Sequence, residues 1–346
     1  MGTDLISSLE QVRQLQIKPG RAFHSAQHEE IANGATTDIY FIRTYEILKK
    51  LAKVDVPVTA EIFPRRGGVI CGVEEVMGLL KDKKVSVWGL PEGSTFEARE
   101  TVLRIQGPYS EFGIFETTIL GMLASASGWA NAAREIKEAA GDHPFFSFGA
   151  RHVHPAVAPV MERAAVVGGA AGASCILGAK LAGQEPQGTV PHAMFIILGD
   201  TVEGARAYHE LMPADAKRTI LIDTFKDEAE EALRVAEALG PALAGVRLDT
   251  PGERGGVTPH LVKEVRHRLD LAGYKHVQIF VSGGLTPERI PPLIEAGADA
   301  FGVGSYISAA APIDMTMDLK EVDGRPVAKR GRLPGITPNP KLVKLK

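Results

Sequence analysis

The segments QIFVSGGL, residues 278–285, and AFGVGSYI, residues 300–307, decide how we interpret the fold. Each is an apolar, β-branched run that ends in glycines and a serine. A run without polar alternation is typical of a strand buried on both faces, as in a parallel sheet or barrel. The intervening segment TPERIPPLIEAGAD predicts a helix with Thr286 as its N-cap and Pro287 in its first turn. The order is therefore strand, glycine-rich turn, helix, strand and glycine-rich turn.

The glycines that follow both strands predict an anion site. Glycine lets backbone N–H groups crowd around an anion, and two adjacent loops of this kind form the phosphate site of many α/β barrels. The candidate phosphate-binding residues are Ser282, Gly283, Gly284, Gly302, Gly304 and Ser305. The alternative is that these glycines only make tight turns. Because the two loops are consecutive, we favour a phosphorylated ligand.

A strand followed by a helix recurs about every 30 residues from residue 145 onward, as a (β/α) barrel requires. Besides the two strands above, the predicted strands lie in FFSFGA, GASCILGAKLAG, GTV, TILIDTF and GVRLDT. The count reaches seven rather than the usual eight. The expected fold class is therefore α/β, with an irregular, incomplete barrel of about seven strands over residues 111–310.

A smaller domain is expected before the barrel. Residues 52–107 contain short apolar runs broken by Gly and Pro, which predict a small, mainly antiparallel sheet. Pro108 marks a boundary, and residues 112–141 predict one long, alanine-rich helix. We therefore assign residues 1–110 to an N-terminal α/β sheet domain, with residues 311–346 folding back onto it.

The bulk composition excludes several classes of function. A net charge of −3 without a basic cluster argues against nucleic-acid binding, and no apolar run is long enough for a membrane span. Cys71 and Cys175 are too few and too far apart for a disulfide framework, which favours a reducing compartment. The N-terminus also lacks the apolar block of a signal peptide. These features predict a cytoplasmic protein.

Polar residues that could carry chemistry gather where the predicted strands end, which is where barrels place their active sites. They are Arg151, Thr189, His192, Asp223, Arg247 and Asp249. The two aspartates could stabilise a developing cation or hold Mg²⁺ through water. The two arginines could bind a carboxylate or phosphate, and the histidine could act as acid, base or phosphoryl acceptor.

Each of these residues also has a purely structural interpretation. Asp223 could cap the helix that follows it, and Arg151 could pair with Glu111 or Glu116. A single histidine such as His192 is often structural. On composition and spacing alone, these alternatives stay open.

The pair His152 and His154 has the spacing of a HxH metal site, but no third ligand is evident nearby. Metal binding is therefore not expected at this pair. The aromatic residues Phe145, Phe146 and Phe148 are expected in the core.

Eight motifs taken in order resemble those of one enzyme family. They are TTDIYFIRT, PYSEFGIFETTILGML, SFGARHVHP, GTVPHA, LIDTF, VRLDTPG, VSGGL and FGVGS. Together the motifs resemble nicotinate phosphoribosyltransferases, type II phosphoribosyltransferases related to the quinolinate and nicotinamide enzymes. The resemblance runs over about residues 20–340, and SFGARHVHP and FETTILG are most similar to the short archaeal and bacterial branch.

The resemblance implies an activity and roles for particular residues. The family forms nicotinate mononucleotide and pyrophosphate from nicotinate and 5-phosphoribosyl-1-pyrophosphate (PRPP) with Mg²⁺, in NAD biosynthesis. ATP hydrolysis drives the reaction through a phosphorylated histidine, which matches His192. Arg151 matches an arginine beside the pyridine ring and its acid group, while Arg247 and Asp249 match residues that face the ribose and pyrophosphate. Tyr40 matches a tyrosine that stacks on the pyridine from the neighbouring subunit, which implies a homodimer or higher homo-oligomer with a shared active site.

Thr189 and Asp223 complete the candidate substrate-binding and catalytic set. Some archaeal relatives carry a four-cysteine zinc knuckle, but no cysteine follows Cys175, so no structural zinc is expected. Thr250-Pro251 replaces the Ser-Gly common in relatives. Val190 stands where nicotinamide-using relatives carry an acid, which favours nicotinate as substrate.

Three alternatives remain. The substrate could be quinolinate or another heteroaromatic acid, or the chain could be a catalytically silent paralogue that only binds ligand. A different phosphate-binding barrel, such as an aldolase or flavin enzyme, would rest on the SGG and GVGS loops alone. No predicted barrel strand ends in the lysine that a Schiff base would need.

Overall fold

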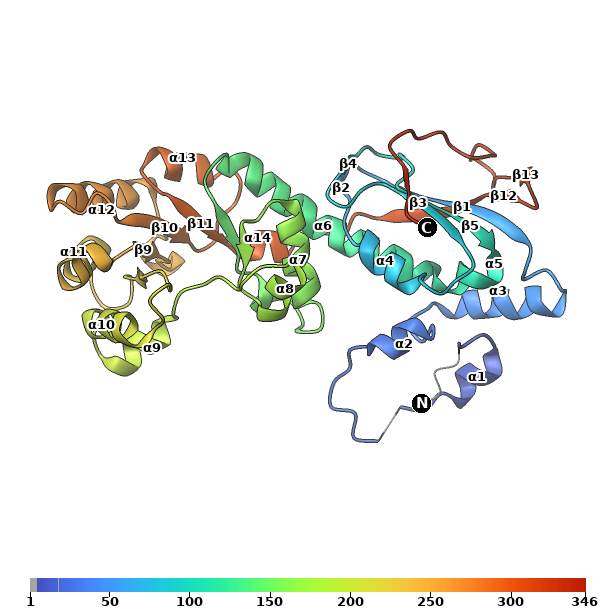
Figure 1. Cartoon of the computed structure of the whole chain (residues 1–346), viewed down its shortest axis with the longest axis horizontal. Coiled ribbons are helices and arrows are strands. Elements are labelled where there is room, and N and C mark those ends of the chain that lie inside the picture. The colour runs from blue at the N-terminus through green and yellow to red at the C-terminus, as the bar shows by residue number, and fades with distance from the viewer. Residues whose placement is uncertain (1–4, 18) are drawn as a thin grey trace. The chain divides into compact units, whose positions relative to one another are not determined.

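The computed structural model describes residues 5–17 and 19–346, which divide into two compact units (Figure 1). Unit 1 comprises Met1–Asn131 and Ala311–Lys346, and unit 2 comprises Ala132–Ala310. The division falls within a long helix, α6 (Glu116–Ala140). Residues 1–4 and 18 of the amphipathic N-terminal stretch lie outside the described residues. Across the described ranges, no helix combines the length and apolarity that crossing a bilayer requires.

Unit 2 is built on a parallel sheet. Its strands are β6 (Phe145–Ser147), β7 (Gly172–Ala173), β8 (Thr219–Leu221), β9 (Gly245–Leu248), β10 (Gln278–Ser282) and β11 (Ala300–Val303). Hydrogen bonds join them in the order β7-β6-β11-β10-β9-β8, and every pairing is parallel. Val281, in the middle of β10, pairs with Phe301 on one side and Leu248 on the other. The prediction of a parallel sheet is confirmed.

The edge strands of this sheet are β7 and β8. The first strand, β6, pairs with the last, β11, whereas no ladder between the edge strands β7 and β8 is found in the described residues. The predicted strand in GTV is wrong, because residues 184–191 are irregular and the sheet has six strands where the structure describes it. Pro186 and Pro191 remove backbone donors from this segment. The N–H of Gln187 donates to the carbonyl of Ala173 at 2.8 Å, a single bond where a ladder was predicted.

Helices alternate with these strands along the chain (Figure 1). They are α7 (Ala158–Gly168), α8 (Ile176–Leu181), α9 (His192–Leu198), α10 (Thr201–Leu211), α11 (Glu228–Leu239), α12 (Pro259–Leu271), α13 (Ile290–Glu295) and α14 (Ser305–Ser308), with 3₁₀ turns η2 (Ala150–His152), η3 (Gly240–Ala242) and η4 (Gly252–Arg254). The helix predicted to start at Thr286 starts instead at Ile290. Its first turn holds Pro291 and Pro292, where missing N–H groups cost little.

Unit 1 is built on an antiparallel sheet with the order β13-β12-β1-β5-β3-β14. The strands of unit 1, including a separate two-stranded sheet of β2 and β4, are β1 (Pro57–Pro64), β2 (Gly68–Val69), β3 (Ser86–Gly89), β4 (Thr95–Phe96), β5 (Leu103–Pro108), β12 (Met315–Val322), β13 (Arg325–Pro326) and β14 (Val343–Lys344). The helices before α6 are α1 (Leu9–Gln14), α2 (His28–Ala32), α3 (Ile39–Lys50), α4 (Val73–Leu79), α5 (Tyr109–Phe112) and the 3₁₀ turn η1 (Gly113–Phe115). The prediction of a small antiparallel sheet is confirmed.

The C-terminal segment is part of this sheet. Strand β12 pairs with β1 from Val58 to Pro64, and β14 pairs with β3. Glu61 is buried, lies 2.8 Å from Arg104 and accepts a bond from the backbone N–H of Thr337 at 3.0 Å. These contacts join the C-terminal segment to residues 57–108 in one sheet.

Candidate active site

Three titratable side chains meet at the carboxyl ends of β8 and β9. His192 is the first residue of α9, Asp223 follows β8 and Asp249 follows β9. The Nε2 atom of His192 lies 3.6 Å from Oδ2 of Asp223 and 4.0 Å from Oδ2 of Asp249. Its Nδ1 atom is 3.0 Å from Oγ1 of Thr224, a residue that the sequence analysis did not single out. Thr224 therefore orients the ring so that Nε2 faces both carboxylates.

Asp223 is a buried carboxylate whose charged neighbour is His192, at 3.6 Å. Its side chain is 1% exposed, and neither oxygen accepts a hydrogen bond of normal geometry from the described residues. Burial raises the pKa of Asp223, whereas the nearby His192 lowers it. The capping role considered for Asp223 belongs instead to Asp227, whose Oδ1 accepts the N–H of Ala229 at 3.1 Å. A buried carboxylate that lacks a hydrogen bond and lies in a cluster of titratable groups is typical of a functional site.

Arg247 connects several of the predicted residues. Its Nε donates to Oγ of Ser282 at 2.9 Å, Nη1 donates to Oγ1 of Thr189 at 3.0 Å, and Nη2 lies 3.3 Å from Oδ2 of Asp249. The guanidinium also lies over the ring of Phe148, 5.2 Å from its centroid. Burial lowers the pKa of Arg247, while the neighbouring carboxylates raise it. Phe148, expected in the core, therefore supports a site residue.

The loop after β10 has the backbone shape that an anion site requires. Gly283 and Gly284 have φ values of +93° and +59°. Arg289, which sequence reasoning missed, donates Nη1 to their carbonyl oxygens at 3.2 and 2.7 Å. In the described part of the chain, the N–H groups of the two glycines donate to no protein acceptor. The hydroxyl of Ser282 is buried and donates to Oδ1 of Asp249 at 2.8 Å, so Ser282 serves the site through that carboxylate.

Close packing explains the glycines at the end of β11 and just after it. A Cβ on Gly302 would lie 2.5 Å from the ring of Phe148, and one on Gly304 would lie 2.9 Å from Cε1 of His152. These contacts give the structural interpretation some weight here. Ser305, the first residue of α14, is exposed and leaves its hydroxyl accessible.

Arg151 lies in η2, after β6, and is exposed. Its Nε donates to Nε2 of His152 at 3.3 Å, and Nδ1 of His152 is 3.1 Å from Oγ of Ser308. Nδ1 of His154 accepts the N–H of Ala156 at 3.1 Å. No group of three His, Cys, Asp or Glu side chains arranged for a metal occurs among the described residues. The outer nitrogens of Arg151 bond to none of the described residues, so they are accessible to a ligand within unit 2.

Glu162 is a site-supporting residue that the sequence analysis overlooked. Its side chain is fully buried on α7, and Oε1 accepts the N–H groups of Gly149 and Ala150 at 3.1 and 3.2 Å. Oε2 accepts the N–H of Cys175 at 2.5 Å. The carboxylate thus joins the loops after β6 and β7. The helical periodicity of residues 156–168 could have revealed a charge on the buried face.

A cavity of about 520 Å³ lies against the parallel sheet. Phe146, Phe148 and Phe280 form an aromatic wall, and Thr189 lines the cavity as well. Because Phe148 and Thr189 both contact Arg247, the cavity lies directly behind that arginine.

Tyr40 is the predicted site residue that belongs to unit 1. It lies on α3, is 55% exposed, and its ring centroid is 4.3 Å from that of Phe41. It also lines a shallow pocket of about 270 Å³ with Asp38 and Glu116. Partial burial raises the pKa of Tyr40, and the two carboxylates raise it further.

Comparison with known proteins places this geometry in a family. The chain matches the models of the quinolinate phosphoribosyl transferase N-terminal domain over residues 38–127 and C-terminal domain over residues 129–318. It is 33% identical over 248 residues to a nicotinate phosphoribosyltransferase of Mycobacterium tuberculosis, covering 69% of this chain and 52% of that protein. The chain thus spans about half the length of this curated relative.

Solved structures give the same assignment. A nicotinate-nucleotide pyrophosphorylase from Pyrococcus furiosus is 46% identical with a TM-score of 0.87, covering 91% of this chain and 82% of that one. Human nicotinic acid phosphoribosyltransferase has a TM-score of 0.71 at 19% identity, covering 87% and 77% of the two chains. The second likeness concerns the fold alone.

Proposed function

Because the chain belongs to the quinolinate phosphoribosyltransferase family of enzymes, we propose that it is a nicotinate phosphoribosyltransferase. It joins nicotinate to PRPP, releases pyrophosphate, and couples this step to ATP through phosphorylation of His192. The observation that carries the proposal is the contact of His192 with two carboxylates, beside a loop with free backbone N–H groups.

In the proposed reaction, the pyridine nitrogen bonds to C1 of the ribose while the bond from C1 to pyrophosphate breaks. The leaving pyrophosphate takes the electron pair, so C1 becomes more positive in the transition state. Asp249 and Asp223 would stabilise that charge because both are ionisable carboxylates on the same rim. The glycine N–H groups after β10 would bind the 5′-phosphate.

Mg²⁺ is implied by the family resemblance, and the donor set fits it. The oxygens of Asp223 accept no hydrogen bond from the described residues, and Asp249 lies near the same His192 nitrogen. Mg²⁺ usually binds one or two carboxylates together with water and substrate phosphates. When bound, it would neutralise charge on the pyrophosphate.

The two arginines favour a substrate with one acid group. The three guanidinium nitrogens of Arg247 already donate hydrogen bonds to Ser282, Thr189 and Asp249. Arg151 alone of this pair keeps outer nitrogens for a carboxylate. Nicotinate carries one carboxylate, whereas quinolinate carries two and would need a denser cationic pocket.

Two further features belong to the proposal. The parallel sheet would form an incomplete α/β barrel that is open between β7 and β8, since its strands follow a ring order. The protein would be a homodimer or larger assembly, in which Tyr40 of a neighbouring subunit stacks on the pyridine. The exposed ring of Tyr40 supports this role.

Quinolinate is the second candidate substrate, because the matching family models carry its name. The test is to measure mononucleotide formation from PRPP and Mg²⁺ with nicotinate, quinolinate or nicotinamide, each with and without ATP. Product from nicotinate that ATP increases is the expected result. Turnover of quinolinate instead would overturn the substrate, and no product from any acid would favour a silent paralogue.

The role of His192 is tested separately with γ-labelled ATP. The wild type should acquire label, and His192→Ala should lose both the label and the stimulation by ATP while a slow transfer remains. His209→Ala, on the exposed side of α10, is the matched control and should behave as the wild type. An unlabelled wild-type protein would exclude the phosphohistidine.

A further inference from the structure

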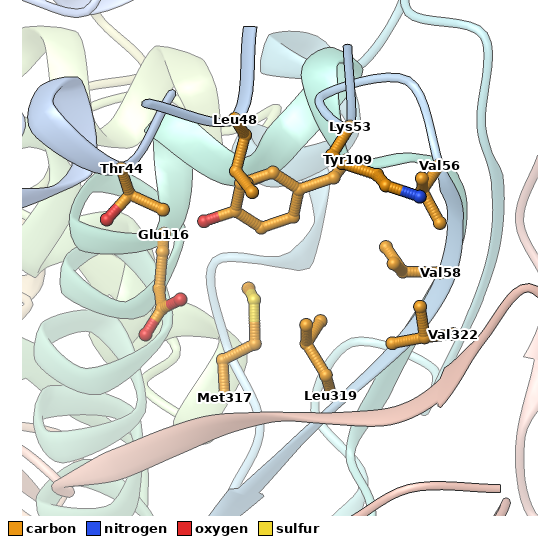
Figure 2. Close-up of a pocket in the computed structure, with 10 residues that line it drawn as sticks. All are labelled: Thr44, Leu48, Lys53, Val56, Val58, Tyr109, Glu116, Met317, Leu319 and Val322. Atoms are coloured by element: carbon orange, nitrogen blue, oxygen red, sulfur yellow. The ribbon is translucent and has the colours of Figure 1, made fainter. Parts of the chain in front are cut away.

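Unit 1 contains a pocket of about 500 Å³ that none of the candidate site residues lines (Figure 2). It lies between α3 and strands β1 and β12, and the starts of α5 and α6 close one side. Its apolar walls are formed by Leu48, Val56, Val58, Met317, Leu319 and Val322. Small-molecule sites usually have volumes of about 300–1,000 Å³ and apolar walls with a few polar groups. This pocket has both properties.

The polar groups of the pocket lie on two opposite sides. Figure 2 shows the hydroxyl of Tyr109 and the carboxylate of Glu116 on one side and the ammonium of Lys53 on the other. Neither the Tyr109 nor the Glu116 side chain makes a hydrogen bond or ion pair with another described residue. Polar groups at a half-buried apolar surface normally have a partner. These two therefore offer a vacant hydrogen-bonding pair to a ligand.

The electrostatics of this pair favour a cation. The pKa of Glu116 is raised to about 7, mainly by burial and also by Asp318, while Lys329 acts in the opposite direction. Burial also raises the pKa of Tyr109 to about 12, so its hydroxyl stays protonated at neutral pH. A cationic nitrogen beside Glu116 would stabilise the ionised carboxylate, whereas an anion would be repelled by Glu116 and Asp318.

We propose that this pocket binds a small apolar monoamine, with the nitrogen held by Glu116 and Tyr109 and the apolar body against β1 and β12. Lys53 at the opposite side would repel a second ammonium group, which excludes diamines. The proposal does not depend on the phosphoribosyl transfer proposed above, since it concerns a different cavity in unit 1.

The test is calorimetric titration of the full chain at pH 8 with 2-phenylethylamine, 2-phenylethanol and 3-phenylpropanoate. The amine should bind at least about tenfold more tightly than the alcohol or the acid, which share its apolar body. Glu116→Gln should weaken amine binding at least about tenfold. Glu138→Gln changes an exposed carboxylate farther along α6 and should leave binding unchanged.

Two further measurements make the test specific. Val322→Phe places a ring in the pocket and should abolish amine binding, while circular dichroism verifies that each variant is folded. Lowering the pH from 8 to 6 should weaken amine binding to the wild type about tenfold, because protonation of Glu116 removes the anion. Equal binding of amine and alcohol, amine binding that survives Glu116→Gln, or no amine binding at all would overturn the proposal.

Discussion

The Nε2 atom of His192 lies 3.6 Å from Oδ2 of Asp223, a buried carboxylate that accepts no hydrogen bond of normal geometry from the described residues. An ionised group in such a place costs folding free energy, because burial removes its hydration without a full replacement. The contact with His192 offsets only part of that cost, since the pKa of Asp223 remains raised. An ionised Asp223 therefore destabilises the fold, which agrees with the role in the reaction that we propose for it.

Asp223→Asn should increase stability and decrease activity. A raised carboxyl pKa in the folded state means that the fold is most stable when this group is protonated and loses stability as the pH rises through the folded pKa. The substitution removes that loss, so at pH 8 the free energy of unfolding should rise by about 1 kcal/mol. Product formation should fall by at least about tenfold.

Denaturant unfolding at several pH values checks this expectation. Below about pH 4, where the carboxyl is protonated in both the folded and unfolded wild type, the two proteins should converge in stability. Asp142→Asn, at an exposed position, should change neither stability nor activity. A lower stability of Asp223→Asn at pH 8 would contradict the argument.

Glu162→Gln should lower both stability and activity. The amide keeps one oxygen but presents an NH₂ group to at least one of the N–H donors of Gly149, Ala150 and Cys175. Leaving a buried donor unsatisfied costs about 1–3 kcal/mol, and the loop that carries Arg151 should loosen. Thermal unfolding and KM for the acid substrate measure the two effects. Glu237→Gln, exposed on α11, is the matched control, and a KM that stays constant would show that Glu162 only stabilises the fold.

The parts of the site that follow strands could be predicted from the sequence. The buried runs of β10 and β11 and the glycines after them indicated a parallel sheet with a loop site, and parallel pairing is observed. Arg247 and Asp249 were found because the ends of parallel strands share one edge. Local sequence patterns and one general rule of topology are enough to locate such residues.

The supporting residues could not be found in the same way. Arg289 donates to the carbonyls of Gly283 and Gly284 from the turn beyond them, and nothing local in the sequence marks that contact. GTV was predicted to be a strand, and Thr and Val do favour strands. The prolines around it prevent a ladder of backbone hydrogen bonds. Tertiary contacts, and prolines that interrupt a strand, leave no periodic pattern in the sequence.

Arg247→Lys should weaken substrate binding although it conserves the charge. Lysine has a single nitrogen and cannot donate at once to Ser282 and Thr189 while contacting Asp249. We expect KM for PRPP to rise by about tenfold or more, with a smaller change in thermal stability. Arg268→Lys on α12, where one exposed ion pair is affected, is the control. Wild-type KM in Arg247→Lys would show that the three contacts do not organise the site.

Comparing Gly283→Ala with Gly273→Ala separates the effect of backbone strain from the effect of a methyl group that crowds the site. Gly283 has a φ of +93°, and a Cβ there would lie 3.3 Å from Oδ1 of Asp249. Gly273 has a φ of +87° with nothing within 4 Å of a Cβ, so Gly273→Ala introduces similar strain in open space. Both substitutions should lower the free energy of unfolding by about 1 kcal/mol, because alanine is strained at positive φ.

The two variants should differ in catalysis. In Gly283→Ala, the new methyl group meets Asp249 beside the N–H groups proposed to bind phosphate, so KM for PRPP should rise at least about fivefold. Gly273→Ala should retain the wild-type KM. Steady-state kinetics with varied PRPP, together with denaturant unfolding of both variants, make the comparison. Equal kinetic defects would mean that the loss arises from general destabilisation, and wild-type kinetics in Gly283→Ala would remove this loop from the phosphate site.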